Sequence, residues 1–215
     1  IYENATINRY KINSNLAIKG PKGKKLQELK QNITNIKNCE LKKNSTNIVF
    51  SDGDPNSKIM IVGEGPGANE DLEGVPFIGK TGELLDKMLL SINLDRDHVY
   101  ITNVVNYRPP ENRSPTKKEI DRYLPHLTRH VEIVNPKILI LLGSSALNAV
   151  IGDEQKISEI RGRWINKKIG KCSTSVIVSF HPAFLMRQPD QKAMSWIDLK
   201  MIRKKISDLK IKIEK

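Results

Sequence analysis

Two side chains with usable chemistry lie in or after apolar runs of this sequence. Asn103 lies in the run at 98–105, and His181 closes the run at 175–182. A side-chain amide both donates and accepts hydrogen bonds, and an imidazole can donate to an oxygen on which negative charge develops. Each residue also has a purely structural alternative, in which Asn103 caps the end of a strand and His181 supports the fold.

A glycine-rich turn, GEGPGANED, follows the apolar run at 58–64. Gly63, Gly65 and Gly67 are spaced two apart, which matches neither the dinucleotide fingerprint nor the P-loop. The turn instead suits close approach of a ligand to bare backbone, and its alternative is a tight turn with no ligand. Glu70 and Asp71 close the turn, where they could position a water molecule or cap the next segment.

The elements that must position these residues alternate between strand and helix. Apolar runs predict strands at 58–64, 98–105, 137–144 and 175–182, and helical spacing predicts helices at 25–39, 81–92, 116–134, 144–152 and 195–213. Thr116 and Glu119 form a capping box that begins the third of these helices, and Pro125 should bend or divide it. This alternation predicts an α/β fold with a parallel sheet, whose ligand crevice lies at the carboxyl ends of the strands.

The charge, the apolar runs and the cysteine count limit the classes of protein to which this chain can belong. The 215 residues carry a formal charge of +12, which favours a polyanionic partner, either nucleic acid or an anionic membrane surface. The alternative is a compositional bias towards Lys, Asn and Ile. We expect a basic polar extension at 1–22 and one domain at 23–215. No apolar run approaches the roughly 20 residues of a membrane span, and two cysteines exclude a disulfide framework, which favours a reducing, cytoplasmic setting.

Three blocks carry a family resemblance: GEGPGANEDLEGVPFIGKTGELLDKML, YITNVVNYRPPENRSPTKKEI and HPAFLMRQP. Together they resemble the family 4 uracil-DNA glycosylases, in order and in register, from about residue 37 to residue 199. The resemblance implies a three-layer α/β/α sandwich with a central four-stranded parallel sheet. It also implies an enzyme that hydrolyses the N-glycosidic bond of uracil in DNA and leaves an abasic site.

The resemblance assigns roles to the pocket residues. Asn103 is similar to the asparagine that reads uracil through O4 and N3–H, and Phe77 to the aromatic residue that stacks on the base. The alternative for Phe77 is an ordinary core position. His181 corresponds to the histidine that donates to uracil O2 as the base departs. Gly65 stands where some relatives carry a catalytic aspartate, so it contributes only backbone to the substrate site.

The acids and the loop after His181 complete the implied site. We expect Glu70 to position the hydrolytic water, and Glu64 to act mainly through its backbone. In the family, an apolar loop tip fills the gap left by the flipped base, which makes Leu185 or Met186 the wedge. Arg187 would then contact a DNA phosphate or hold the loop.

The sequence departs from the family at the ligands of its four-iron, four-sulfur cluster. The four ligand positions read Ile36, Cys39, Tyr107 and Tyr123, and a single thiolate cannot hold such a cluster. Cys172 lies far away in the sequence, in a lysine-rich turn. We therefore predict no iron–sulfur cluster and no other cofactor, with Ile36 and the tyrosines packed together in its place.

The expected partner is uracil-containing DNA, single- or double-stranded, with no membrane and no second subunit. The expected compartment is a bacterial-type cytoplasm, with use at the nucleoid. A non-catalytic DNA-binding descendant of a glycosylase is the main alternative, and a small-molecule nucleotide enzyme is a third.

Overall fold

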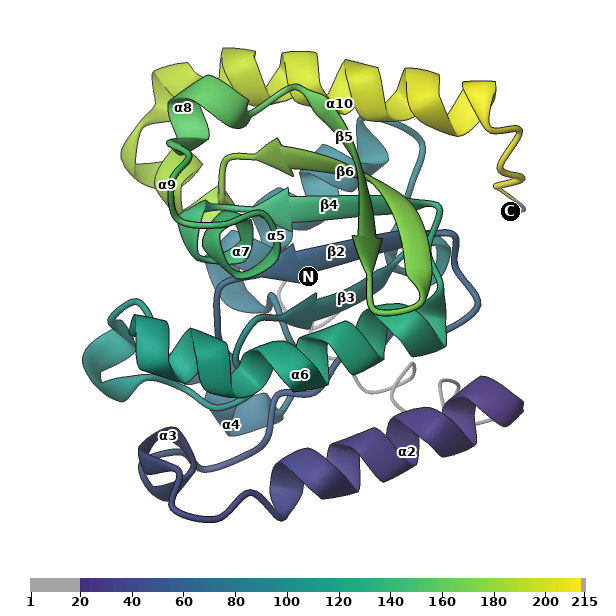
Figure 1. Cartoon of the computed structure of the whole chain (residues 1–215). Helices are drawn as coiled ribbons and strands as arrows, with labels where there is room; N and C mark the ends of the chain where they lie inside the picture. The colour runs from purple at the N-terminus through teal and green to yellow at the C-terminus, as the bar shows by residue number, and fades with distance from the viewer. Residues whose placement is uncertain (1–19, 214–215) are drawn as a thin grey trace, which may run out of the picture.

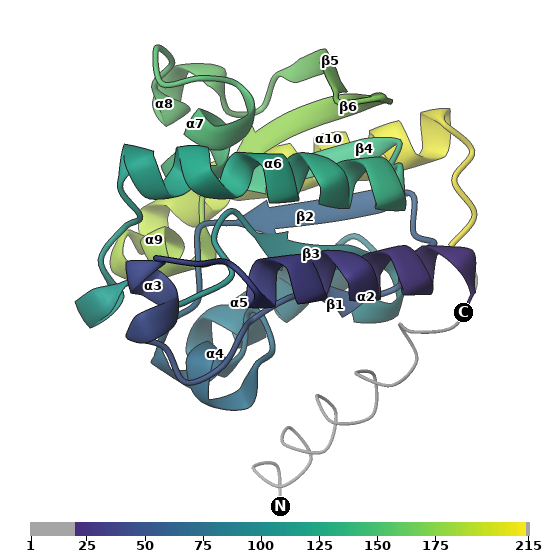
Figure 2. The same cartoon turned by 60° about the horizontal axis from the view of Figure 1, so that its bottom comes forward.

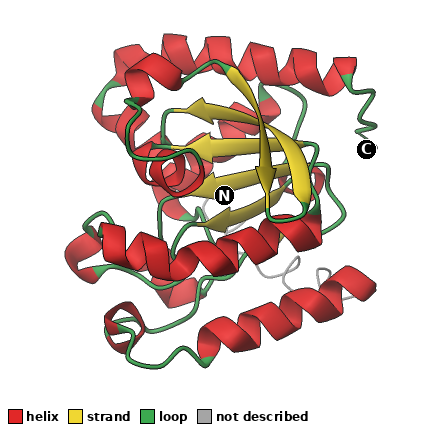
Figure 3. Cartoon of the chain, in the orientation of Figure 1, coloured by secondary structure: helices red, strands yellow, loops and turns green. Residues whose placement is uncertain are grey.

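A single mixed sheet forms the centre of the molecule (Figures 1 and 3). The computed structural model describes residues 20–213, and the predicted extension at 1–22 falls almost wholly outside that range. The sheet has the strand order β1-β3-β2-β4-β6-β5. Its strands are β1 (Asp52–Gly53), β2 (Ile59–Gly63), β3 (Tyr100–Asn103), β4 (Ile138–Leu142), β5 (Trp164–Ile169) and β6 (Cys172–Ser179).

The four central strands are parallel, as predicted, and an antiparallel strand pairs with each outer one. β3, β2, β4 and β6 run in one direction, while β1 pairs with β3 and β5 with β6 in the opposite sense. The sequence did not predict β1 or β5. Cys172 also differs from its expected place in a turn, because it is the buried first residue of β6.

Helices cover both faces of the sheet. One face is covered by α2 (Pro21–Thr34), α6 (Lys117–Val134) and α7 (Ser144–Val150), and the other by α5 (Gly79–Leu90) and α10 (Lys192–Asp208). Figures 1 and 2 show α2 lying alongside α6. The short helices are α3 (Glu40–Lys43), α4 (Ala68–Glu73), α8 (Ile157–Ile160) and α9 (Pro182–Arg187), with 3-10 turns η2 (Arg96–His98), η3 (Pro110–Asn112) and η4 (Pro189–Gln191).

Alternation along the buried strands divides the interior into two cores. In β2, Met60 and Val62 face the core under α2 and α6, while Ile59 and Ile61 face the core under α5 and α10. This is the period of two that a strand covered on both faces must show. The layers are those of an α/β/α sandwich. The first described helix, α2, begins at Pro21, two residues before the predicted start of the domain at residue 23.

The helix α6 begins where the capping box predicts and is not divided at Pro125. The Thr116 hydroxyl accepts from the Glu119 amide, and the Glu119 carboxylate accepts from the Thr116 amide. Tyr123 and Leu127 are fully buried on either side of Pro125. Their packing compensates for the one backbone hydrogen bond that proline removes. No helix within residues 20–213 is both long and apolar enough to cross a membrane.

Candidate active site

One open cleft of about 1170 Å³ lies at the carboxyl ends of the parallel strands. β2 leads into it at residue 64, β3 ends in it at Asn103, and the chain enters it again after β6 at His181. Seven of the predicted site residues line it: Glu64, Gly65, Glu70, Phe77, Asn103, His181 and Arg187. The sheet therefore gathers, in a single cavity, residues that are more than one hundred positions apart in the sequence.

Gly63 brings Asn103 and Phe77 together. Gly63 pairs with Asn103 in the β2–β3 register. A Cβ atom at Gly63 would lie 2.4 Å from Cζ of Phe77 and 2.5 Å from Oδ1 of Asn103, so only glycine fits. The amide oxygen of Asn103 and the ring of Phe77 thus converge on the same bare stretch of backbone, and both side chains are buried. An amide beside a ring is an arrangement that can hold a flat polar heterocycle.

Phe77 is held in an unusual backbone conformation. Its φ of 54° lies in the left-handed region, which costs a residue with a side chain about 1–2 kcal/mol. Its ring lies beside that of His181, with the ring centres 5.4 Å apart and the planes inclined by 29°. Two of the predicted site residues are therefore in direct ring contact.

His181 is the N-cap of α9, and its surroundings favour the neutral form of the imidazole. Its Nδ1 accepts a hydrogen bond from the Ala183 amide at 3.2 Å, so the neutral ring carries its proton on Nε2. Burial lowers the pKa of His181 to about 4, with Arg187 lowering it further and Glu64 opposing the shift. At neutral pH the ring is an uncharged hydrogen-bond donor. Gly143 leaves it room, since a Cβ there would lie 3.1 Å from Cβ of His181.

Glu64 is the acid whose carboxylate lies in the cleft with polar side-chain partners. It accepts hydrogen bonds from Ser145 and from Ser114, the latter at 3.2 Å to each oxygen. The sequence predicts that Glu64 acts mainly through its backbone, whereas in the structure its carboxylate is engaged by these two side chains. Neither serine was identified from the sequence, because Ser114 lies in the loop before α6 and Ser145 in the first turn of α7.

Glu70 is predicted to position the hydrolytic water, with capping of the next segment as the alternative. The structure shows the capping geometry. Its two oxygens accept from the Gly67 and Ile78 amides, each at 3.0 Å, and the side chain is buried. Its neighbour Asp71 binds the Thr46 and Asn47 amides in the same way. Both acids therefore hold the loop around the cleft, which favours Glu64 over Glu70 as the carboxylate available to a substrate or a water molecule.

The structure separates the two candidates for the wedge. Leu185 is 1% exposed and packs in the core beneath α9, so the expectation that it could be the exposed tip is wrong in this structure. Met186 is 42% exposed, and Arg187 is exposed beside the cleft. Since α9 packs against α5, its buried face is fixed, and of the two wedge candidates Met186 is the one that lies at the surface.

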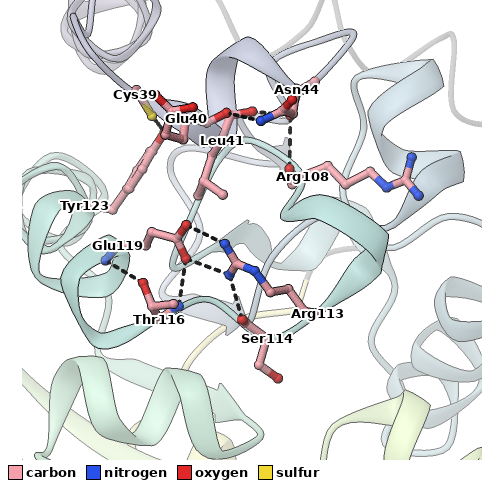
Figure 4. A network of polar contacts seen from close by, with 11 residues as sticks. Cys39, Glu40, Leu41, Asn44, Arg108, Arg113, Ser114, Thr116, Glu119 and Tyr123 are labelled. Atoms are coloured by element: carbon pink, nitrogen blue, oxygen red, sulfur yellow. Dashed lines mark hydrogen bonds and ion pairs between the residues drawn. The ribbon is translucent and has the colours of Figure 1, made fainter.

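The residues at the four cluster-ligand positions do not fit an iron–sulfur cluster. Sγ of Cys39 lies 3.3 Å from the Tyr123 hydroxyl, and Ile36 and Tyr107 pack into the same core (Figure 4 shows Cys39 and Tyr123). Burial raises the pKa of Tyr107 and Tyr123, so both phenols stay protonated and are poor metal ligands. Among residues 20–213, no group of three or more His, Cys, Asp or Glu side chains could hold a metal ion.

A second polar network shapes the loop that borders the cleft. Arg113 makes two hydrogen bonds to the Glu119 carboxylate, at 2.8 and 2.7 Å, and a third to the Ser114 carbonyl (Figure 4). The hydrogen bonds from Arg113, and after them those from Thr116, lower the pKa of Glu119 to about 2. The charged pair thereby holds Ser114 near Glu64.

Comparisons with known proteins agree with this geometry. The model of the uracil DNA glycosylase superfamily matches residues 50–204. The chain is 38% identical to the type-4 uracil-DNA glycosylase of Sulfurisphaera tokodaii over 183 residues, covering 83% of each protein. It is 36% identical to that of Pyrobaculum aerophilum over 82% of this chain and 92% of the relative. With that of Thermotoga maritima it shares 41% identity, over 65% of this chain and 71% of the relative.

Proposed function

Because the chain belongs to the uracil-DNA glycosylase superfamily, we propose that its cleft removes uracil from DNA by hydrolysing the N-glycosidic bond, which leaves an abasic site. The observation that carries this proposal is the convergence of Asn103, Phe77 and His181 on one cavity. A glycosylase must swing its target base out of the helix and read its edge in a pocket. These three side chains supply an amide, a stacking ring and a hydrogen-bond donor.

Each pocket residue has a separate task. The Asn103 amide donates to uracil O4 and accepts from N3–H, whereas cytosine presents the opposite pattern and leaves both amide groups without partners. The Phe77 ring stacks on the base. As the bond breaks, negative charge develops on uracil O2, and Nε2–H of neutral His181 stabilises it.

Glu64 is the residue that acts on the sugar in the proposed reaction. The departing base leaves an oxocarbenium-like sugar, which a nearby carboxylate stabilises and which a water molecule then attacks. Glu64 is oriented by Ser114 and Ser145, and its charge also acts on His181. We propose Glu64 as the group that stabilises this cation and positions the water, with Gly65 leaving room for the sugar.

DNA is the partner that the +12 charge favours. Met186 takes the place of the flipped base as an apolar wedge, and Arg187 contacts a flanking phosphate. We further propose that the protein acts as a monomer on single- or double-stranded DNA, in the cytoplasm of the cell and at its nucleoid. Sizing of the protein alone and with a uracil-containing duplex tests the monomer, because a dimer would double the mass of the free protein and add the mass of a second protein to the complex.

An alkali assay tests the activity. Oligonucleotides that differ only in one central base, uracil, thymine or cytosine, are incubated with the protein and then heated in alkali, which breaks the strand at an abasic site. Breaks at uracil alone support the proposal. Tight binding of the uracil strand without breaks would instead identify a non-catalytic DNA-binding protein, and breaks at cytosine would contradict the role of Asn103.

We also propose that this protein works without an iron–sulfur cluster. The purified protein should be colourless and free of iron, and its activity should survive chelators. A triple variant, Ile36→Cys, Tyr107→Cys and Tyr123→Cys, is the matched control, because together with Cys39 it restores four thiols at one place. Iron and visible absorbance in the unaltered protein would overturn the proposal.

A further inference from the structure

The backbone turn that presents Phe77 to the cleft has a partner outside the cleft. Phe77 adopts its left-handed conformation directly after Pro76, and the carbonyls of both residues accept hydrogen bonds from a side chain of η2. Arg96, the first residue of η2, donates from Nη1 to the Pro76 carbonyl at 3.1 Å and from Nη2 to the Phe77 carbonyl. Arg96 does not line the cleft itself.

Two carboxylates fix the guanidinium that makes these bonds. Nε of Arg96 donates to Asp86 at 2.8 Å, and Nη1 donates to Asp52 at 2.8 Å. Asp52 belongs to the edge strand β1 and Asp86 to α5, so the guanidinium joins both elements to the turn at Phe77. The Arg96 side chain is 12% exposed and that of Asp52 8%, so water competes little for the bond between them, while Asp86 is 29% exposed.

The opposite side of the same carbonyl is closed by a glycine. A Cβ atom at Gly82 would lie 1.8 Å from the Phe77 carbonyl oxygen and 3.4 Å from Nη2 of Arg96. The carbonyl therefore sits between the guanidinium and the bare backbone of α5. No other side chain fits at position 82 without moving the Phe77 turn.

We propose that Arg96 is a positioning residue that holds the Phe77 turn, and through it the ring, in the place where a flipped base stacks. The effect of Arg96 on catalysis rests on the proposed function, whereas the contacts between Arg96 and the Phe77 turn do not depend on it. Lysine cannot replace Arg96, because a single ammonium cannot span two carbonyls and two carboxylates as the planar fork does. A positive charge at position 96 is therefore not enough to hold the Phe77 turn, and the planar guanidinium is required.

Fluorine NMR tests the contact directly, without reference to activity. The chain has only four phenylalanines, at positions 50, 77, 180 and 184, so labelling with 4-fluorophenylalanine gives four signals, and Phe77→Leu assigns the one of interest. In Arg96→Gln and Arg96→Lys, the Phe77 signal should shift or split while that of Phe50 stays fixed. The matched control is Arg161→Gln, which breaks another buried pair, with Asp198, and should move the signal of Phe180 instead.

Catalysis gives the second measurement. Single-turnover excision of uracil should be about 10-fold to 100-fold slower in both Arg96 variants, as expected when a group that contacts the substrate is misplaced. Their affinity for a duplex without uracil should not change, because that binding does not use the pocket. Arg161→Gln should leave the Phe77 signal unchanged.

The two kinds of failure are distinguishable. An unchanged Phe77 signal in folded Arg96 variants overturns the inference, as does equal broadening of all four signals, which would show a general loss of structure. If the Arg96 variants do not fold, Gly82→Ala displaces the same carbonyl from the other side and must move the same signal. If the unaltered protein excises no uracil, the proposed function fails, while the fluorine spectra still decide whether Arg96 holds Phe77.

Discussion

Acidification should charge His181 only at a pH far below that of an ordinary histidine. The ring lies half-buried in the cleft, and desolvation there lowers its pKa from 6.5 to about 4, with Glu64 opposing the shift and Arg187 adding to it. The proposed donor role needs the neutral ring with its proton on Nε2. The single-turnover rate should therefore stay level, as far as this group determines it, from neutral pH down to about pH 5 and fall as the pH approaches 4.

The same shift affects the stability of the fold. Below pH 6.5 an unfolded chain takes up a proton at this histidine, whereas the folded protein does so only near pH 4. The folded state thus loses stability as the pH falls through this window, and the contribution of His181 is fully present above it. A lowering from 6.5 to about 4 corresponds to roughly 3 kcal/mol, at about 1.4 kcal/mol per pH unit.

Imidazole NMR resolves the titration of single histidines. The chain has four, and His181→Gln assigns the signal of interest. Two neighbours provide internal controls with opposite signs: Glu64→Gln should lower the midpoint further, and Arg187→Gln should raise it. In urea unfolding at pH 7 and pH 5, His181→Gln should lose less stability on acidification than the unaltered protein, which separates this residue from the buried His130, whose pKa is also lowered.

A midpoint near 6.5 would refute the reasoning, because the cleft would then be too well hydrated to hold a neutral ring. If neither Glu64→Gln nor Arg187→Gln moves the midpoint of the His181 titration, the charge effects of these two neighbours are refuted, but the effect of burial is not. A rate that falls between pH 7 and 6 together with the His181 signal would show that the ring charges at its ordinary pH.

Three further outcomes are expected. Asn103→Ala should slow uracil excision about 10-fold to 100-fold through the loss of one buried polar contact, with duplex binding unchanged in a gel-shift assay. Met186→Ala should weaken binding to uracil-containing duplex without changing urea unfolding, whereas Leu185→Ala should cost about 2–5 kcal/mol of stability because it opens a cavity in the core. Tyr123→Phe should lower stability by about 1 kcal/mol through the loss of its contact with Cys39, as measured by thermal unfolding.

The placement of the main site residues could be predicted because parallel strands share one carboxyl edge. Asn103 and His181 follow strands that are recognisable as buried apolar runs, so their proximity follows from the topology. The edge strands could not be predicted in the same way. β1 has only two residues, and the alternation of β5 is interrupted by Lys167 and Lys168, which resemble a polar turn.

Other features depend on contacts between distant segments. The buried side of the six-residue helix α9 is set by α5, so the sequence could not distinguish Leu185 from Met186. The bond from the Ile78 amide to Glu70 closes a loop that leaves no periodic pattern. The sequence places Gly63 in a turn that suits close approach of a ligand, whereas in the structure it is the last residue of β2, and the two side chains that require a glycine there come from separate elements.

The strand order also governs when the cleft can exist. β6 is the last of the parallel strands along the chain and enters the sheet beside β4, and His181 follows it. A chain that has completed only β2, β3 and β4 carries Asn103 and Phe77 but lacks His181, the third of the side chains that converge on the cleft. The three side chains can therefore meet only once the last parallel strand has docked beside β4.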